Sequence, residues 1–234
     1  MKQYGKLFGV GVGPGDPELI TVKAVRVIKQ ADIVFTAAST RNAYSLAVEI
    51  ASDYIAEDVP VVKLSFPMTK EEKEVEAAWK KNAETIALEL EQGRNAVFLT
   101  LGDPMTYSTF GYILKKMASV MPEADIETVP GITSFHAASA RLNRILVEGE
   151  QSLLVTSGAF GGDRIRKIAD IENLAVVKAY KNMEDITRAL RETGLDNNCV
   201  AVSRCGRENE QIIESLENLE KRAPDYWTLI LAAK

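Results

Sequence analysis

Apolar stretches rich in β-branched residues alternate with helix-like stretches along the first half of this 234-residue chain. The strand-like stretches are 6–12, 32–38, 59–66 and 95–101, and the helix-like stretches between them are 19–31, 43–55 and 70–92. Such alternation is typical of βαβ units, in which helices cover both faces of parallel strands. We therefore predict an α/β fold with a mostly parallel sheet.

The first predicted helix carries an apolar stripe at three-residue steps, formed by Leu19, Val22, Val25 and Ile28. Asp16 and Pro17 suit the N-cap and first position of this helix. The helix near 70–92 has opposite charges at helical spacing, which indicates a solvated face with Trp79, Ile86 and Leu90 turned inward. We expect no catalytic role for that polar helix.

The second half of the chain repeats the alternation with different spacing. Strand-like stretches at 152–158, 174–180, 199–205 and 227–233 enclose helix-like stretches at 164–170 and 183–194. A second α/β domain follows from this pattern, and the Pro-Gly pair after Val129 marks a boundary. We expect domains at residues 1–129 and 130–234.

Composition and charge exclude several classes of protein. A 46% apolar content is enough for a core, and no apolar run approaches the roughly 20 residues that cross a bilayer. The N-terminus also lacks a signal-peptide pattern, so we expect a cytoplasmic protein without a membrane partner. A net charge of −5 without a basic block argues against nucleic acid as a partner.

Metal and thiol chemistry are equally poorly supported. The single histidine, His136, and the two cysteines, Cys199 and Cys205, match no zinc or redox spacing. We expect reduced thiols in or near the core, a packed or surface histidine, and no protein-bound metal.

The segment "LFGVGVGPGDPELITVKAV" at 7–25 looks like the glycine loop of a dinucleotide-binding protein. That fingerprint needs glycines at its first, third and sixth positions. Counting from Gly9 puts Pro14 in the sixth place, and counting from Gly11 puts Asp16 there. Acidic side chains also disfavour a phosphate. A dinucleotide oxidoreductase is therefore disfavoured.

Gly-Asp-Pro occurs twice, at 15–17 and 102–104, each time after an apolar strand and before a helix. Carboxyl ends of parallel strands lie at one edge of a sheet, where ligands of α/β proteins bind, so the two loops are expected to face one cleft. A third loop, "VPGITSF" at 129–135, places Thr133 and Ser134 before a small-residue helix. Ordinary capped turns remain an alternative for these loops.

Taken together, "GVGPGDPELIT", "TLGDPMTYSTFGY" and "VPGITSF" resemble the tetrapyrrole methylase family in order and rough spacing. The resemblance implies a mostly parallel N-terminal sheet, a mixed C-terminal sheet, and S-adenosylmethionine (SAM) in the cleft between two domains of a homodimer. The N-terminal domain would carry the substrate trough, and the C-terminal domain would close the cleft. SAM carries no phosphate, in agreement with the failed fingerprint.

Within that family, "GDPMTYSTFGYI" and "VPGITSFHAASARLNRILVEGEQSLLV" are similar to the C-20-methyltransferases of precorrin-2 or cobalt-precorrin-2 in cobalamin biosynthesis. The resemblance implies methyl transfer from SAM to a meso carbon of an anionic tetrapyrrole, followed by loss of a proton. Whether that substrate carries cobalt stays open. Alignment of the reacting atoms would be the enzyme's main task.

The resemblance also implies residue roles. The cofactor contacts would be Leu101, Gly102, Asp103, Thr106, Thr133 and Ser134. The substrate side would be lined by Pro14, Asp16, Met105 and Tyr107. The catalytic proton acceptor is unassigned, with Asp16 and Tyr107 as candidates. Looser alignments put further SAM contacts near Lys181 and Cys205. The side chains of three arginines would either bind substrate carboxylates or lie in solvent: Arg41, Arg141 and Arg144.

Three other functions remain as alternatives. One is methylation of another tetrapyrrole carbon, and a second is methylation of a different acceptor, as in the related diphthine synthases. The third, in a different class, is a non-catalytic module that binds a tetrapyrrole or SAM.

Overall fold

The computed structural model describes residues 4–39, 45–168, 170–223 and 225–234. The chain divides into two compact units, residues 1–133 and 134–234. Residues 130–133, which the sequence assigns to the second domain, thus belong to the first unit.

The first unit is built on a five-stranded parallel sheet in the order β3-β2-β4-β1-β5. The strands are β1 (Lys6–Gly11), β2 (Ile33–Ser39), β3 (Val61–Phe66), β4 (Ala96–Thr100) and β5 (Asp125–Val129). All five residues of β4 are buried, as expected for a central strand covered on both faces. The predicted parallel sheet is confirmed.

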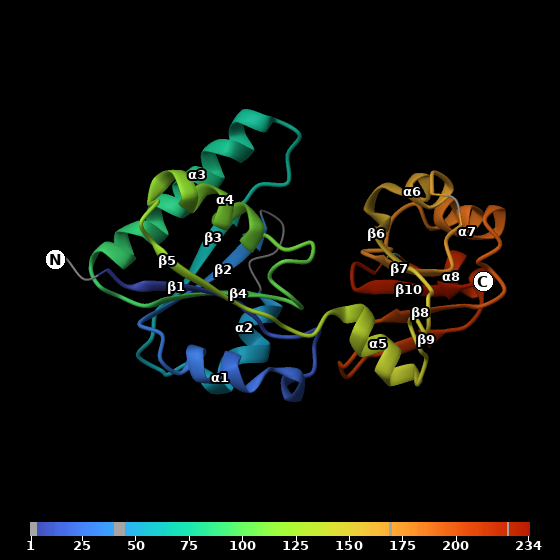
Figure 1. Cartoon of the computed structure of the whole chain (residues 1–234), viewed down its shortest axis with the longest axis horizontal. Helices are drawn as coiled ribbons and strands as arrows, with labels where there is room; N and C mark the ends of the chain where they lie inside the picture. The colour runs from blue at the N-terminus through green and yellow to red at the C-terminus, as the bar shows by residue number, and fades with distance from the viewer. Residues whose placement is uncertain (1–3, 40–44, 169, 224) are drawn as a thin grey trace. The chain divides into compact units, whose positions relative to one another are not determined.

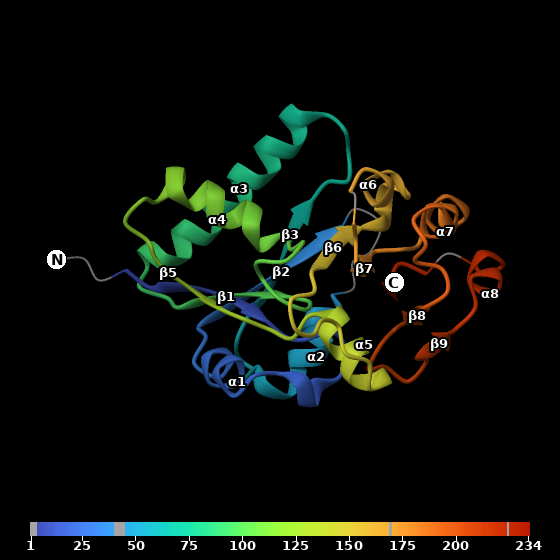
Figure 2. The same cartoon turned by 45° about the vertical axis from the view of Figure 1, so that its right-hand side comes forward.

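Helices cover both faces of this sheet (Figure 1). α1 (Val22–Ile28) and α2 (Leu46–Ala51) lie on one face, and α3 (Glu72–Glu91) and α4 (Phe110–Val120) lie on the other, in both views (Figure 2). The core under α3 and α4 includes the fully buried side chains of Phe35, Phe98, Phe110, Ile86 and Leu90.

The first helix begins later than the sequence predicts. Asp16 caps a short 3-10 turn, Pro17–Leu19, by accepting a hydrogen bond from the backbone N–H of Glu18. Thr21 is the N-cap of α1, because its hydroxyl accepts from the N–H of Ala24. The predicted stripe is only partly confirmed, because Ile28 is buried and Leu19 and Val25 are half-buried. Val22 is 88% exposed, whereas the buried residues are Ala24, Val27 and Ile28.

The long polar helix predicted near 70–92 is confirmed as α3, which buries Ile86 and Leu90. Its half-buried Trp79 stacks on Tyr112 of α4, with ring centroids 4.0 Å apart and planes at 9°. This contact joins the two helices at the edge of their shared core.

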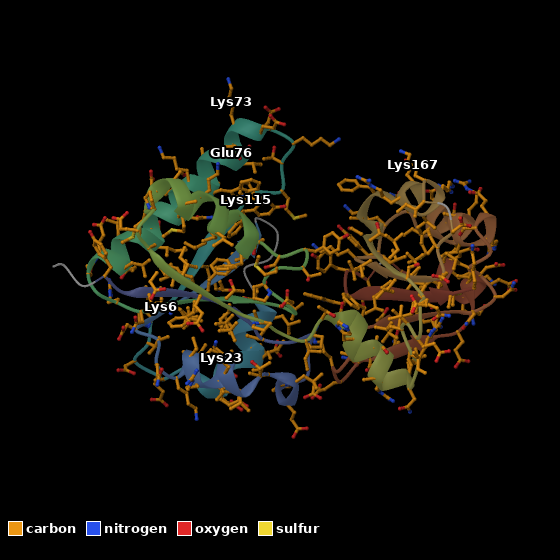
Figure 3. All side chains as sticks on the ribbon, viewed as in Figure 1. Lys6, Lys23, Lys73, Glu76, Lys115 and Lys167 are labelled. Carbon is orange, nitrogen blue, oxygen red and sulfur yellow. The ribbon has the colours of Figure 1, made fainter. Side chains whose placement is uncertain are left out.

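The edge strand β5 carries a charge network on its outer surface. Glu127 contacts the ammonium groups of Lys6 at 2.8 Å and Lys23 at 2.5 Å. Both lysines are labelled in Figure 3. They hold the pKa of the Glu127 carboxyl at about 2, well below its ordinary 4.5. Charged side chains on an edge strand also disfavour pairing with another sheet.

The second unit contains a mixed five-stranded sheet in the order β6-β7-β10-β8-β9, as predicted. Its strands are β6 (Leu153–Ser157), β7 (Asn173–Val177), β8 (Cys199–Ser203), β9 (Gln211–Ile213) and β10 (Thr228–Ala233). β10 runs antiparallel to both β7 and β8, and β6 runs parallel to β7. The carboxyl ends of β7 and β8 therefore meet at one edge of the sheet.

Helices on both faces of the sheet complete the described part of the second unit (Figure 1). α5 (Ser134–Leu142) packs on β7 and β10, while α6 (Asp163–Arg166), α7 (Met183–Glu192) and α8 (Leu216–Glu220) contribute to a core on the sheet. Figure 1 shows α5 on one face of the sheet and α6 and α7 on the other. β9 and α8 were not expected from the sequence.

Among the described residues, no helix has the length and apolar character needed to cross a membrane. In the same part of the chain, no three His, Cys, Asp or Glu side chains gather as metal ligands would. Both cysteines are free thiols. Cys205 is buried and Cys199 is half-buried, as expected.

Candidate functional site

β1 and β4 are neighbours in the first sheet, and the helices that follow them lie on opposite faces. Such a topological switch point is where open α/β sheets bind ligands, at the carboxyl ends of the strands. The two Gly-Asp-Pro loops leave these two strand ends. The prediction that both loops lie at the carboxyl ends of the parallel strands is confirmed. The fold indicates a binding site at this end of the sheet independently of any resemblance.

The loops at this edge approach each other closely through their backbones. Gly13 and Gly102 form a reciprocal pair, with N···O distances of 3.4 and 2.7 Å. A Cβ on Gly11 would lie 2.4 Å from the Gly102 carbonyl oxygen and 2.8 Å from the Gly131 Cα. A Cβ on Gly131 would lie 2.1 Å from the same oxygen. Only glycine permits three backbones to approach this closely.

Asp103 connects two of the loops through its carboxylate. Oδ1 accepts hydrogen bonds from the Met105 N–H at 2.9 Å and the Thr106 hydroxyl at 3.2 Å. Oδ2 accepts from the N–H of Gly131 at 3.2 Å. Both oxygens are thus engaged within the protein.

The other residues expected to contact the cofactor lie close along the chain to this junction. Leu101, Gly102, Thr106 and Thr133 are all half-buried members of the first unit. The backbone of Gly102 has a left-handed φ of +67°. Ser134 is half-buried and begins α5 in the second unit. The structure therefore brings together five of the six expected cofactor residues within one unit, including Asp103.

The residues expected on the substrate side differ in accessibility. Met105 is 61% exposed and Tyr107 is 49% exposed. Tyr107 also has a left-handed φ of +51°, which is uncommon for a bulky side chain and typical of functional loops. Pro14 is buried, and Asp16 is half-buried and serves as the cap described above.

The charge of this edge fits some ligands better than others. Residues 11–21, 101–109 and 130–133 contain three acidic side chains, several hydroxyl groups and no lysine or arginine. A phosphate would find no cationic partner in these loops. A ligand that carries positive charge suits these acidic loops better than a phosphate.

Two of the arginines considered for substrate carboxylates are engaged within the second unit. The Arg141 Nε lies 2.7 Å from Oε1 of Glu210, and an Arg144 guanidinium nitrogen donates to the Asn198 carbonyl at 2.8 Å. Arg41 lies outside the described residues. The solvent-exposed His136 contacts the ring of Phe135 on α5.

A second polar region lies at the strand ends of the second unit, where the resemblance loosely placed Lys181 and Cys205, and the sequence did not single out its left-handed residues. Lys178 and Asn182 after β7, and Arg204 after β8, all have left-handed backbones, with φ of 56°, 54° and 56°. Burial lowers the pKa of the Lys178 ammonium group. The residue types do not mark these conformations at Lys178 and Arg204, because lysine and arginine rarely adopt them, whereas asparagine does so more often.

A cavity of about 440 Å³ opens at the same strand ends. It is lined by residues that follow β7, end β8 and begin β10, among them Tyr180, Lys181, Ser203 and Thr228. Lys181 thus lies in a cavity wall, as a ligand contact would. Cys205 does not line this cavity, and burial, with Glu210 nearby, raises the pKa of its thiol to about 11.

Comparison with known proteins assigns the family. The family model of the Tetrapyrrole (Corrin/Porphyrin) Methylases matches residues 6–220. The chain belongs to the tetrapyrrole methylases. This family assignment confirms the resemblance carried by the three loops.

Two curated members of the family match this tetrapyrrole methylase over nearly its whole length. The cobalt-precorrin-2 C(20)-methyltransferase of Salmonella typhimurium is 34% identical over 232 residues, covering 98% of this chain and 97% of the relative. The precorrin-2 C(20)-methyltransferase of Sinorhizobium sp is 32% identical, covering 97% of this chain and 94% of the relative.

A solved structure confirms the fold of this tetrapyrrole methylase. The uroporphyrin-III C-methyltransferase of Thermus thermophilus, complexed with S-adenosylhomocysteine, superposes with a TM-score of 0.72. It is 23% identical, and the match covers 98% of this chain and 92% of that one.

Proposed function

We propose that this protein is a SAM-dependent C-methyltransferase of cobalamin biosynthesis that methylates C-20 of precorrin-2 or cobalt-precorrin-2. The observation that carries the proposal is end-to-end similarity to two relatives that bear this activity in their names. The loops at the switch point of the first sheet are acidic and offer no lysine or arginine to a phosphate. This supports SAM as the methyl donor, because SAM carries no phosphate.

We assign the methyl donor to the junction of the three loops. Leu101, Gly102 and Thr133 would offer backbone groups, and Thr106 and Ser134 would add hydroxyl groups. Asp103 would contribute its backbone and any remaining lone pairs of its carboxylate. SAM supplies an electrophilic methyl group on a sulfonium, so the protein needs no nucleophilic side chain of its own.

We assign the substrate side of the proposed site to Met105, Tyr107, Pro14 and Asp16. The two exposed side chains offer apolar and aromatic surface to a flat macrocycle. Holding the meso carbon in line with the methyl group is the chief catalytic contribution, since positioning alone lowers a barrier by several kcal/mol, on the order of 7.

A proton must leave C-20 after methylation, and Asp16 and Tyr107 are the candidate acceptors. Tyr107→Phe removes the phenolic oxygen and keeps the ring, whereas Asp16→Asn keeps the cap acceptor and removes the carboxylate. The variant that loses kcat with an unchanged KM for the tetrapyrrole identifies the acceptor. Equal retention of kcat in both variants would exclude both residues.

The substrate is assigned by comparing kcat/KM for cobalt-precorrin-2 and metal-free precorrin-2 under anaerobic conditions. A preference of about tenfold or more, worth about 1.4 kcal/mol, selects one of the two. Saturable binding of SAM and tetrapyrrole without any turnover would instead indicate a non-catalytic binding module and contradict the proposal.

We further propose that the enzyme is a cytoplasmic homodimer. Two free cysteines are in keeping with a reducing compartment. The homodimer follows from the family resemblance, and sedimentation equilibrium tests it. A particle of two chains is expected across micromolar concentrations, and a single-chain particle would contradict the assignment.

A further inference from the structure

The Asp103 carboxylate connects two motifs that lie 28 residues apart in the sequence. One motif is the Gly-Asp-Pro loop after β4, and the other is the Pro-Gly-Ile loop after β5. Asp103 closes the turn of its own loop through Met105 and Thr106, and reaches the other loop through Gly131.

The glycines beside this contact cannot replace the hydrogen bond that Asp103 makes. The two loops meet where the Gly131 and Gly102 backbones touch, and glycine has no side chain that could hold them together. The Gly131 N–H donates to Oδ2 of Asp103, a hydrogen bond to a charged group that is stronger than an ordinary one. The carboxylate is therefore a side-chain link between the two loops.

We propose that Asp103 is a positioning residue whose carboxylate sets the spacing between loop 101–106 and loop 130–133. This inference rests on the proposed function, which assigns methyl-donor contacts to both loops. Fixing their spacing before the donor arrives lowers the ordering cost of binding. Asp103 thus acts on donor affinity through the Gly131 backbone, in addition to any contact of its own.

The Asp103→Asn variant tests this role because its carboxamide has one acceptor oxygen where the carboxylate has two. The remaining oxygen is expected to keep the two hydrogen bonds of the turn, and the amide NH₂ group, which cannot accept a hydrogen bond, then faces Gly131, so the link to Gly131 is lost. Two readouts are measured: the exchange rate of the Gly131 amide by NMR without ligand, and the affinity for S-adenosylhomocysteine by calorimetry.

Asp32→Asn provides a matched control at the amino ends of the strands in the same sheet. Asp32 is an exposed residue whose Oδ2 accepts from the backbone N–H of Asn95 at 2.7 Å, likewise joining two segments distant in sequence. It precedes β2 and lies away from the carboxyl ends of the strands. The control thus removes the same negative charge, while the remaining amide oxygen can still accept from Asn95, so no link between segments is lost and the proposed site is untouched.

We expect Asp103→Asn to speed exchange of the ligand-free Gly131 amide and to weaken S-adenosylhomocysteine binding about tenfold, the loss of one hydrogen bond to a charged group. The KM for SAM should rise more than kcat falls. Asp32→Asn should leave all three quantities at wild-type values. If Asp103→Asn fails to fold, Asp103→Glu, which keeps the charge but displaces it, is measured with the same expectations.

Two results would overturn the inference in distinguishable ways. Unchanged Gly131 exchange, or an affinity equal to that of Asp32→Asn, contradicts the positioning role and leaves the proposed function standing. Wild-type protein that does not bind S-adenosylhomocysteine contradicts the proposed function itself, and the positioning role with it.

Discussion

At the residue scale, the glycines of the three loops explain why separate motifs form one site. Sequence spacing identified the loops and predicted that two of them share an edge. It could not predict the contact from Asp103 to Gly131, because that contact depends on β5 lying beside β1. The left-handed backbones of Tyr107 and Lys178 were equally beyond prediction, since tertiary contacts must impose them.

The close approach at Gly11 predicts a large cost for a single methyl group. Gly11→Ala places a Cβ within 3 Å of two backbones that cannot yield cheaply. We expect a loss of about 3 kcal/mol in the free energy of unfolding, measured by urea denaturation. Gly111→Ala on α4 is the control, because nothing lies within 4 Å of its added Cβ. It should match or exceed native stability by up to about 1 kcal/mol, and equal losses in both variants would contradict the packing argument.

The lowered pKa of Glu127 predicts that the folded state loses part of its stability in acid. Its carboxyl pKa is lowered from 4.5 to about 2 by Lys23 and Lys6, so folding favours the ionised form. The stabilisation is present above about pH 4.5 and is lost as the pH falls towards about 2. Glu127→Gln should lower the melting temperature at pH 6 and flatten its decline between these values.

The control for Glu127 is Glu91→Gln at the end of α3, which also removes one negative charge from an exposed site. Melting curves from pH 6 to pH 2 are compared for the three proteins. A decline in Glu127→Gln as steep as in the wild type would show that the two lysines do not stabilise the folded state through this carboxylate.

At the element scale, long periodic stretches were predicted well, whereas two of the short elements, β9 and α8, were not. Strands such as β4 are continuous apolar runs, and α3 spans 20 residues with clear amphipathic spacing. β9 and α8 have 3 and 5 residues, too few to show a period. The first helix was misplaced because Asp16 and Thr21 both resemble caps, and only the structure shows that they serve different turns.

A substitution of Thr21 tests whether this residue caps the start of α1. Thr21→Ala removes the hydroxyl that accepts from the Ala24 N–H and should cost about 1 kcal/mol of unfolding free energy. Thr109→Ala is the control, because Thr109 precedes α4 without a side-chain capping hydrogen bond. The free energies of unfolding of both variants are measured by chemical denaturation. A cost for Thr21→Ala no larger than that for Thr109→Ala would contradict the assignment of the cap.

At the scale of the whole molecule, the strand order determines where function can lie. β4 follows three earlier strands in sequence yet lies between β2 and β1. Local patterns do not specify that insertion, which creates the switch point and brings the two Gly-Asp-Pro loops together. The second unit contributes a mixed sheet and a cavity whose lining residues come from strand ends and α8.

The central claim is methylation at C-20, and one measurement tests it most directly. Purified protein is incubated anaerobically with SAM labelled with ¹³C in its methyl group and with precorrin-2 or cobalt-precorrin-2, and the product is analysed by mass spectrometry and NMR. The account predicts one labelled methyl group per macrocycle, attached to C-20. A labelled methyl group on any other carbon, or no transfer to either substrate, would contradict it.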